Sequence, residues 1–140
     1  MLRKVILDTG GLVAVLDRSD RYHNWAVKEW EKIAKPLLTC EAVITESCFI
    51  LQDVYGSEDA IMALIERRTI QIDFRFNDEV KVIRGLMQRY QSVPMSFADA
   101  CLVRMSELIV GSSVLTLDSD FYIYRKNRKE MIDLIIPEGV

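Results

Sequence analysis

The chain has 140 residues, half of them hydrophobic, which fits one globular domain over residues 1–140 with a single core. It has no run of about 18 apolar residues, so we expect no membrane-spanning helix, and its amino-terminal apolar stretch is too short for a signal peptide, so we expect a cytoplasmic protein. Its net charge of −3 excludes nucleic-acid binding through bulk positive charge, so any such binding must rest on local basic patches or metal ions.

Short apolar runs alternate with helix-period patterns along the whole chain. The expected elements, in chain order, are a strand at Lys4–Leu7, a turn at Thr9–Gly11, a helix at Leu12–Leu16, a helix with Tyr22, Trp25, Trp30 and Ile33 on one face, a strand at Leu37–Thr39, a helix at Glu41–Tyr55, a helix capped by Ser57, a strand at Thr69–Phe74, helices at Asn77–Tyr90 and Ser96–Leu108, and strands at Ser113–Leu117 and Ile132–Ile136. Thr39 is the expected N-cap of the third helix, and Gly56 the residue after its end. Strands that alternate with helices predict an α/β protein with a mainly parallel central sheet.

Two of the expected strands end in an aspartate, Asp8 and Asp118. In open parallel sheets, ligands bind beyond the carboxyl ends of the strands. If the two strands are parallel neighbours, both carboxylates therefore lie at the same rim. An aspartate after a strand is also often a turn residue or a helix cap, so neither residue alone identifies a site.

Three more acidic residues are candidates for the same rim. Glu46 lies in a helical stretch poor in charge, where a buried carboxylate is costly unless it is paired or bound to a metal; alternatively it lies at the edge of the apolar stripe and reaches water. Asp99 belongs to a Ser96-x-x-Asp99 capping box, and a helix N-terminus can at the same time aim a carboxylate into a cleft. Asp120 could join the site or cap the following turn, and capping is favoured.

The collective chemistry of these carboxylates points to divalent cations. At a separation of about 5 Å and an effective dielectric near 20, each pair of carboxylates repels by roughly 3 kcal/mol. Either some of them are protonated or cations neutralise them. Ligands that are all oxygen favour Mg²⁺ or Mn²⁺ over zinc. Such ions orient a water molecule, lower its pKa and stabilise charge on a phosphodiester.

Histidine and cysteine chemistry has little support in the composition. The chain has one histidine, His23, and its three cysteines form no C-x-x-C pair. This argues against a zinc site, and against Ser-His-Asp or Cys-His catalysis unless His23 is the base. We expect Cys40, Cys48 and Cys101 to be small, reduced core residues.

Four segments, in order, resemble the motifs of the PIN-domain family. They are Leu7–Ala14, Thr45-Glu46, Ser96–Ala100 and Thr116–Phe121. The resemblance implies a three-layer α/β/α fold and an endoribonuclease, dependent on Mg²⁺ or Mn²⁺, that hydrolyses RNA phosphodiester bonds. The residues that it assigns to catalysis and metal binding are Asp8, Glu46, Asp99 and Asp118, with Asp120 as an additional ligand and Thr9 and Thr116 as polar support.

The resemblance also bears on the partners of the chain. Single-domain PIN proteins of this size are often VapC-type toxins of bacterial toxin–antitoxin pairs, commonly homodimers inhibited by a small antitoxin. It therefore implies an RNA substrate, a homodimer and a small antitoxin protein. The densest basic run contains Arg125, Lys126, Arg128 and Lys129, and it either contacts RNA phosphates or forms a solvated loop. Arg18, Arg21 and Arg104 are further candidates for RNA contacts.

Two other functions compete with the nuclease. A phosphatase could use Asp8 as a nucleophile, but the haloacid-dehalogenase pattern has a second aspartate two residues on, where this chain has Gly10. A non-catalytic PIN-like module could bind RNA or a protein, although the presence of all four acidic residues argues against it. Divalent-ion binding would separate the enzyme from the module, and a phosphoenzyme intermediate would favour the phosphatase.

Overall fold

A computed structural model of the chain describes residues 3–140. In chain order its elements are β1 (Val5–Leu7), α1 (Thr9–Leu16), α2 (His23–Lys32), β2 (Leu37–Leu38), α3 (Glu41–Ile50), α4 (Ser57–Glu66), β3 (Ile70–Gln71), α5 (Phe76–Arg89), α6 (Phe97–Leu108), β4 (Ser113–Leu115), the 3₁₀ helix η1 (Ser119–Tyr122), β5 (Arg125–Lys126), β6 (Glu130–Met131) and β7 (Leu134–Ile135). Strands and helices alternate as the sequence predicts.

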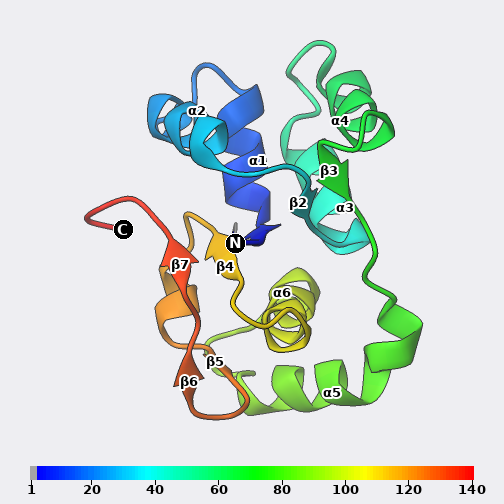
Figure 1. Cartoon of the computed structure of the whole chain (residues 1–140), viewed down its shortest axis with the longest axis vertical. Helices are drawn as coiled ribbons and strands as arrows, with labels where there is room; N and C mark the ends of the chain where they lie inside the picture. The colour runs from blue at the N-terminus through cyan, green and yellow to red at the C-terminus, as the bar shows by residue number, and fades with distance from the viewer. Residues whose placement is uncertain (1–2) are drawn as a thin grey trace.

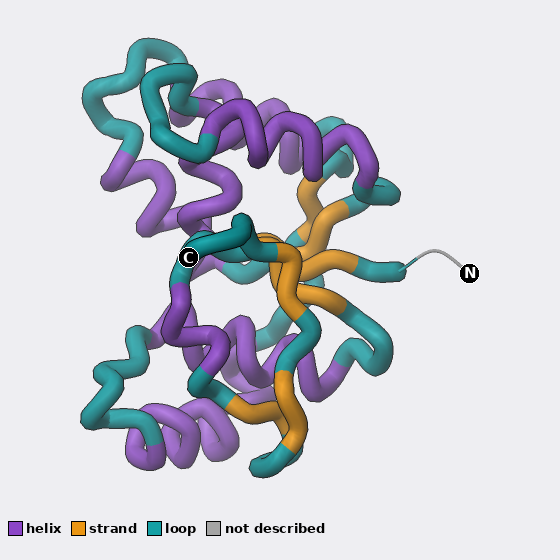
Figure 2. Tube along the Cα trace, turned by 90° about the vertical axis from the view of Figure 1, so that its left-hand side faces the viewer, coloured by secondary structure: helices purple, strands orange, loops and turns teal. Residues whose placement is uncertain are grey.

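A parallel sheet lies at the centre of the molecule. Its strand order is β3-β2-β1-β4-β7, and every neighbouring pair is parallel. Figure 1 shows α1 to α4 on one side of the sheet and α5 and α6 on the other, and Figure 2 shows the strands between the two groups of helices. This arrangement confirms the predicted three-layer α/β/α fold.

The alternation of side chains along β1 explains why both faces of the sheet carry helices. Val5 and Leu7 point into one apolar cluster, together with Leu12 of α1. Ile6 points into a second cluster with Leu102 of α6. All three β1 side chains are buried, as expected for a parallel strand that is covered on both faces.

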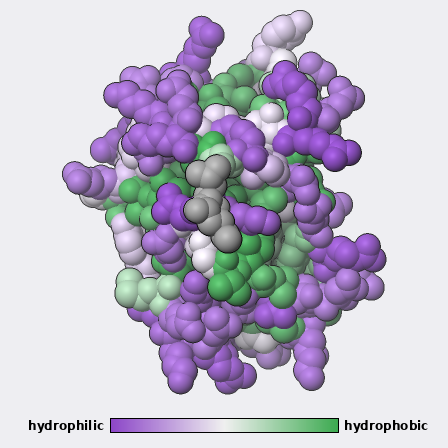
Figure 3. All heavy atoms as spheres, viewed as in Figure 1, coloured by the Kyte–Doolittle hydropathy of each residue, from purple (hydrophilic) through white to green (hydrophobic). Residues whose placement is uncertain are grey.

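The side of the molecule on which the strands begin is shown in Figure 3. Hydrophilic side chains cover most of its periphery, and hydrophobic side chains show through near the middle. Within residues 3–140 no helix is both long enough and apolar enough to cross a bilayer. The carboxyl ends of the strands lie on the opposite side.

The first helix begins earlier than the sequence predicts. Gly10 and Gly11 were expected in a turn, but both lie inside α1. A Cβ atom on Gly11 would lie 3.2 Å from Cγ of Leu115 and 3.3 Å from Cδ1 of Leu7. The glycines therefore let the first turn of α1 pack directly against the sheet, and this close approach outweighs the low helix propensity of glycine.

The third helix is shorter than the sequence predicts, and its capping differs. It ends at Ile50 rather than Tyr55, and Cys40 is its N-cap, without a side-chain hydrogen bond. The predicted cap, Thr39, instead donates its hydroxyl to the Leu7 carbonyl at 2.7 Å, which ties β2 to β1. Turns follow α3, and the Ser57 hydroxyl donates a 2.8 Å hydrogen bond to the Leu51 carbonyl, just beyond the end of the helix. Ser57 is therefore the first residue of α4 rather than its cap.

Gly56 was expected just beyond α3, and it is the N-cap of α4, with a φ of 78°. The strand predicted at Thr69–Phe74 is only two residues long. The basic run, expected to be a loop if it does not bind RNA, forms an antiparallel hairpin of β5 and β6. Such short strands leave no period-2 pattern for sequence analysis to detect.

Candidate active site

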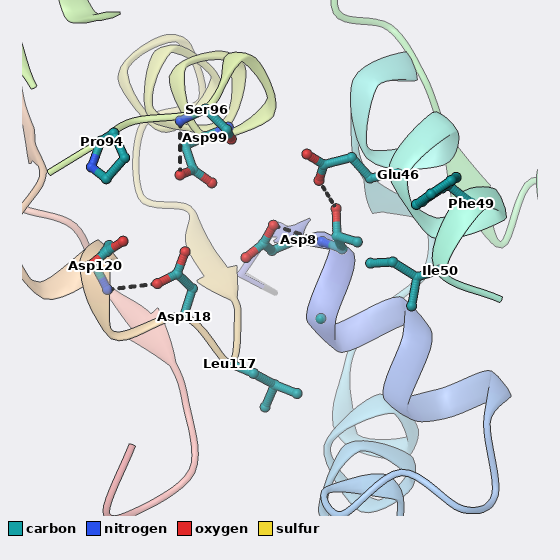
Figure 4. Close-up of a pocket in the computed structure, with 12 residues that line it drawn as sticks. Asp8, Glu46, Phe49, Ile50, Pro94, Ser96, Asp99, Leu117, Asp118 and Asp120 are labelled. Atoms are coloured by element: carbon teal, nitrogen blue, oxygen red, sulfur yellow. Dashed lines mark hydrogen bonds between the residues drawn. The ribbon is translucent and has the colours of Figure 1, made fainter. Parts of the chain in front are cut away.

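Acidic residues from four segments converge at the carboxyl edge of the sheet. Asp8 follows β1, Glu46 lies on α3, Asp99 on α6, and Asp118 follows β4, which pairs directly with β1. Their side chains, with that of Asp120, line one pocket of about 720 Å³. We call it the carboxylate pocket. Figure 4 shows Asp8, Asp99 and Asp118 pointing toward the same space, with Glu46 across from them.

Asp8 is the most buried carboxylate of the pocket, only 5% exposed. Its Oδ1 caps α1 by accepting a 2.7 Å hydrogen bond from the Thr9 backbone amide. Its Oδ2 accepts a 2.6 Å hydrogen bond from the Thr116 hydroxyl. Burial is the largest cause that raises the pKa of Asp8 to about 7 despite these two bonds, and the nearby charges of Asp99 and Asp118 contribute to the same rise.

Thr116 joins the ends of the two central strands. It is fully buried just beyond β4, where its hydroxyl donates to Asp8 and accepts a 3.0 Å bond from the Asp118 backbone amide. A single hydroxyl therefore fixes the positions of two acidic residues that are 110 positions apart in the sequence.

Asp99 is held at the start of α6 by a complete capping box. The Ser96 hydroxyl accepts from the Asp99 amide at 3.0 Å, and the Ser96 amide donates to Oδ2 of Asp99 at 3.4 Å. The buried hydroxyl of Tyr124 donates to the same Oδ2 at 2.9 Å. Burial is the largest cause of the raised pKa of Asp99. Capping and a position in the pocket thus coexist, as the sequence allowed.

Glu46 turns toward the pocket and is half-buried. Its Oε1 accepts a 2.7 Å hydrogen bond from the Thr9 hydroxyl. Thr9 therefore contacts two carboxylates, through its amide to Asp8 and through its hydroxyl to Glu46. The carboxylate of Glu46, whose burial in a charge-poor helix costs free energy, thus has a hydrogen-bond partner in Thr9.

Asp118, rather than Asp120, is the cap of the 3₁₀ helix. Oδ1 of Asp118 accepts a 2.8 Å bond from the Asp120 amide. The side chain of Asp120 lines the pocket instead. Burial and the nearby charge of Asp118 raise the pKa of Asp120.

The donor set of the pocket suits a hard divalent cation. Within residues 3–140, the protein donates no hydrogen bond to Oδ1 of Asp99, Oε2 of Glu46 or Oδ2 of Asp118. Each carboxylate is thus held by one oxygen and presents the other. No three His, Cys, Asp or Glu side chains in the described part of the chain lie close enough together to ligate one ion directly. Mg²⁺ keeps several waters and takes one or two carboxylates, so ligation partly through water fits this spacing.

The sequence matches a known family, and the fold is similar to that of a known protein. A family model of the PIN domain matches residues 5–127. The chain belongs to the PIN-domain family. Its fold is similar to the crystal structure of VapC20 from Mycobacterium tuberculosis, described as a toxin that cleaves the sarcin–ricin loop. The TM-score is 0.72 at 19% sequence identity, over 84% of this chain and 92% of that one. No curated protein matches the sequence significantly.

The basic candidates of this PIN domain lie outside the carboxylate pocket. Nη1 of Arg125 donates to the carbonyls of Tyr122, Ile123 and Tyr124. It therefore supports the start of the hairpin. Arg104 forms ion pairs with acidic side chains of α5 and α6. Arg128 and Lys129 are exposed at the hairpin turn.

His23 also lies away from the pocket. Its Nδ1 lies 2.7 Å from the Ala14 carbonyl, which joins α2 to α1. Cys40 and Cys101 are buried in the core, and Cys48 is half-buried. The positions of Cys40 and Cys101 agree with the core location expected from the sequence.

Sequence reasoning missed two features of the pocket. Tyr124, which bonds Asp99, follows a 3₁₀ turn that no periodic pattern marks. Phe49 and Ile50 line the pocket although they are 69% and 57% exposed. The apolar pattern of α3 signals their hydrophobic character but not the side to which they face.

Proposed function

We propose that this PIN domain is an endoribonuclease that hydrolyses RNA phosphodiester bonds with Mg²⁺ or Mn²⁺. The observation that carries the proposal is the convergence of Asp8, Glu46, Asp99 and Asp118 from four separate segments on one pocket. Burial of a repelling carboxylate costs free energy that a purely structural role would not require. The proposal is supported by membership of the PIN-domain family and by the similarity in fold to a toxin described as cleaving the sarcin–ricin loop.

The proposed ligands, some of them acting through water molecules, are Asp8, Glu46, Asp99 and Asp118, with Asp120 at the rim. A bound divalent cation would neutralise these carboxylates, lower the pKa of the attacking water and stabilise charge on the phosphodiester. Thr116, Thr9 and Tyr124 fix one oxygen of Asp8, Glu46 and Asp99, respectively. Oε2 of Glu46 and Oδ1 of Asp99 would then hold an ion or accept a proton from water, whereas both oxygens of Asp8 already accept one hydrogen bond and would bind an ion through their remaining lone pairs. The reaction adds water across one P–O bond, so the departing ribose oxygen leaves as a hydroxyl.

The decisive assay incubates the purified protein with a pool of structured RNAs, with and without Mn²⁺. We expect cleavage that EDTA removes and that Asp8→Asn abolishes. The matched control is Asp17→Asn, because Asp17 lies outside the pocket and bonds Ser19 at the end of α1; it should cleave like the wild type. Cleavage that survives both EDTA and Asp8→Asn would refute the mechanism. A phosphoenzyme trapped on Asp8 would favour the phosphatase instead.

We also propose that the protein acts as the toxin of a toxin–antitoxin pair, in the cytoplasm and as a homodimer. The support for the toxin role is the similarity in fold to a toxin described as cleaving the sarcin–ricin loop. Induced expression in a bacterial host should stop growth, and Asp8→Asn should not. Light scattering of the purified protein should give twice the chain mass of 16.2 kDa. Equal growth of both strains would count against the toxin role.

A further inference from the structure

The exposed side of α5 carries a row of basic side chains. Lys81, Arg84, Gly85, Gln88 and Arg89 have the spacing i, i+3, i+4, i+7 and i+8, which places them on one helix face. All five are exposed. The other side of α5 packs through buried residues against α6. The basic row is therefore directed away from the core.

Two adjoining hollows run along this row. One, of about 540 Å³, lies between α5 and the β5–β6 turn and is lined by Lys81, Arg89 and Arg128. The other, of about 700 Å³, lies over Lys81, Arg84 and Gly85. Figure 1 shows the hairpin beside the carboxyl-terminal end of α5. We call the row and the hairpin turn together the α5 basic face.

The acidic residues that line the two hollows, Asp78 and Glu107, are already paired, and so is Glu79 beside Asp78 on α5. Asp78 pairs with Arg75 at 3.0 Å, and Glu79 pairs with Arg104 at 2.6 Å. Glu107 pairs with the same arginine at 3.1 Å and also accepts from the Asn127 amide at 2.7 Å.

The basic residues of the face, in contrast, have no acidic partner. In the described residues, no ion pair involves Lys81, Arg84, Arg89 or Arg128. Within residues 3–140, the one cation–π contact among these four is that of Arg89, which lies over the Tyr90 ring at 6.0 Å. Although the net charge of the chain is −3, the α5 basic face thus carries positive charges that no ion pair neutralises.

Gly85 keeps the middle of the groove open. A Cβ atom at this position would meet nothing within 4 Å. Its backbone does not have a positive φ, so the helix does not need glycine there. A glycine inside a helix lowers its stability, and in this place it lets a ligand approach the helix backbone.

We propose that the α5 basic face binds the phosphate backbone of the RNA substrate, while the scissile bond lies in the carboxylate pocket. The nine residues from Lys81 to Arg89 span about 12 Å, a length along which a nucleic-acid duplex carries several phosphates. The two regions are also joined. Pro94, five residues after α5 ends, lines the carboxylate pocket, and the Tyr90 ring contacts Tyr124, which bonds Asp99.

This inference rests on the proposed ribonuclease function, and its test is a binding measurement that does not depend on cleavage. The probe is a fluorescent RNA stem–loop in EDTA, titrated from 50 to 200 mM KCl. The test variant is Lys81→Gln/Arg84→Gln/Arg128→Gln. The matched control is Lys4→Gln/Lys28→Gln/Arg67→Gln, which removes the same charge from exposed residues before β1, on α2 and just after α4.

We expect the test variant to bind roughly ten- to a hundredfold more weakly at 100 mM salt, with a salt slope shallower by about 2 to 3, since each lost phosphate contact removes about one unit. The control should stay within about threefold of the wild type, because non-contacting charges act only through the screened field. Equal weakening of both variants, or of neither, would overturn the proposal. So would tighter binding of poly-glutamate than of RNA, because it would assign the face to an acidic protein partner.

A second variant separates binding from folding. Gly85→Gln places a side chain in the open hollow and should raise Tm, because glutamine forms helix better than glycine, while weakening RNA binding. Unchanged RNA affinity in a folded Gly85→Gln protein would contradict the proposed groove. The nuclease proposal is tested by a separate measurement, because it depends on cleavage by the wild type and on the loss of cleavage in Asp8→Asn.

Discussion

The Thr116 hydroxyl donates a 2.6 Å hydrogen bond to Oδ2 of Asp8, across two neighbouring parallel strands. The same hydroxyl accepts from the Asp118 amide. One buried oxygen atom thus orients the carboxylate of Asp8 and holds the backbone of Asp118, at the ends of two neighbouring strands. This contact makes the relative position of Asp8 and Asp118 a property of the sheet rather than of flexible loops.

Replacing this hydroxyl should damage the site more than the fold. Thr116→Val keeps the shape but leaves the Asp118 amide without its acceptor, which costs about 1–3 kcal/mol of stability. Cleavage should fall by about 10- to 100-fold, the usual effect of losing a partner that orients a metal ligand. Unfolding and cleavage assays on the same preparation measure both. Thr116→Ser should restore activity, and if it does not, the hydroxyl is not the cause.

The raised pKa of Asp8 predicts that the fold loses stability as the pH rises. Below about pH 4 the carboxyl is protonated in the folded and the unfolded chain. Between pH 4 and 7 the unfolded chain releases the proton, while the folded chain, with a pKa of about 7, keeps it. Stability therefore falls across this window and levels off above it. Since each pKa unit is worth about 1.4 kcal/mol, the loss approaches about 4 kcal/mol.

Urea unfolding in EDTA at pH 4.5 to 8.5 tests this dependence. Asp8→Asn removes the titrating group, so its stability should decline less over the same range, and at pH 8 it should exceed that of the wild type. Parallel curves for the two proteins would show that Asp8 keeps an ordinary pKa in the folded state.

Divalent cations should stabilise the protein in the opposite pH direction. Metal ligands must be deprotonated, so binding strengthens as Asp8 and Asp99, both with raised pKa, lose their protons. The rise in Tm on adding Mn²⁺ should therefore be larger at pH 8 than at pH 5.5. Asp99→Asn should reduce the rise at pH 8. A rise independent of pH and of Asp99 would place the ion elsewhere.

The sequence predicted the rim of the sheet better than it predicted the details around it. Asp8 and Asp118 could be placed together because apolar strands that alternate with helices must form a parallel sheet, whose carboxyl ends share one edge. The partners of these residues could not be placed. Thr39 looks like a helix cap locally, yet it bonds a neighbouring strand. Tertiary contacts of this kind leave no local pattern.

The bounds of α3 and α1 were wrong for related reasons. Leu51, just after the end of α3, is buried in the core and is therefore apolar. The apolar run thus continues past Ile50, and the hydrophobic pattern does not reveal that the helix has ended. Gly10 and Gly11 have the composition of a turn, but close packing on the sheet keeps them in a helix. In both places burial decides the structure, and local propensity does not.

Tyr124 should act as a positioning residue for Asp99. Tyr124→Phe removes the hydroxyl that donates to Oδ2, and cleavage should fall by about tenfold or more. Tyr90→Phe is the matched control, because the Tyr90 hydroxyl accepts from the Arg125 amide and does not contact the carboxylates. Both variants should lower Tm slightly, and only Tyr124→Phe should weaken the Mn²⁺-induced rise in Tm. An equal loss of cleavage in both would reduce Tyr124 to a structural role.

Two helical glycines should respond to alanine in opposite directions. Gly11→Ala puts a Cβ 3.2 Å from Leu115 and 3.3 Å from Leu7, all within the core, so the packed neighbours must shift at a cost of about 1–3 kcal/mol. Gly85→Ala meets open space on α5 and should stabilise by about 0.5–1 kcal/mol, because alanine favours the helix. Urea unfolding of both variants measures the difference. If Gly11→Ala were as stable as the wild type, α1 would not pack on the sheet as closely as described, and the position of Asp8 at its N-terminus would need revision.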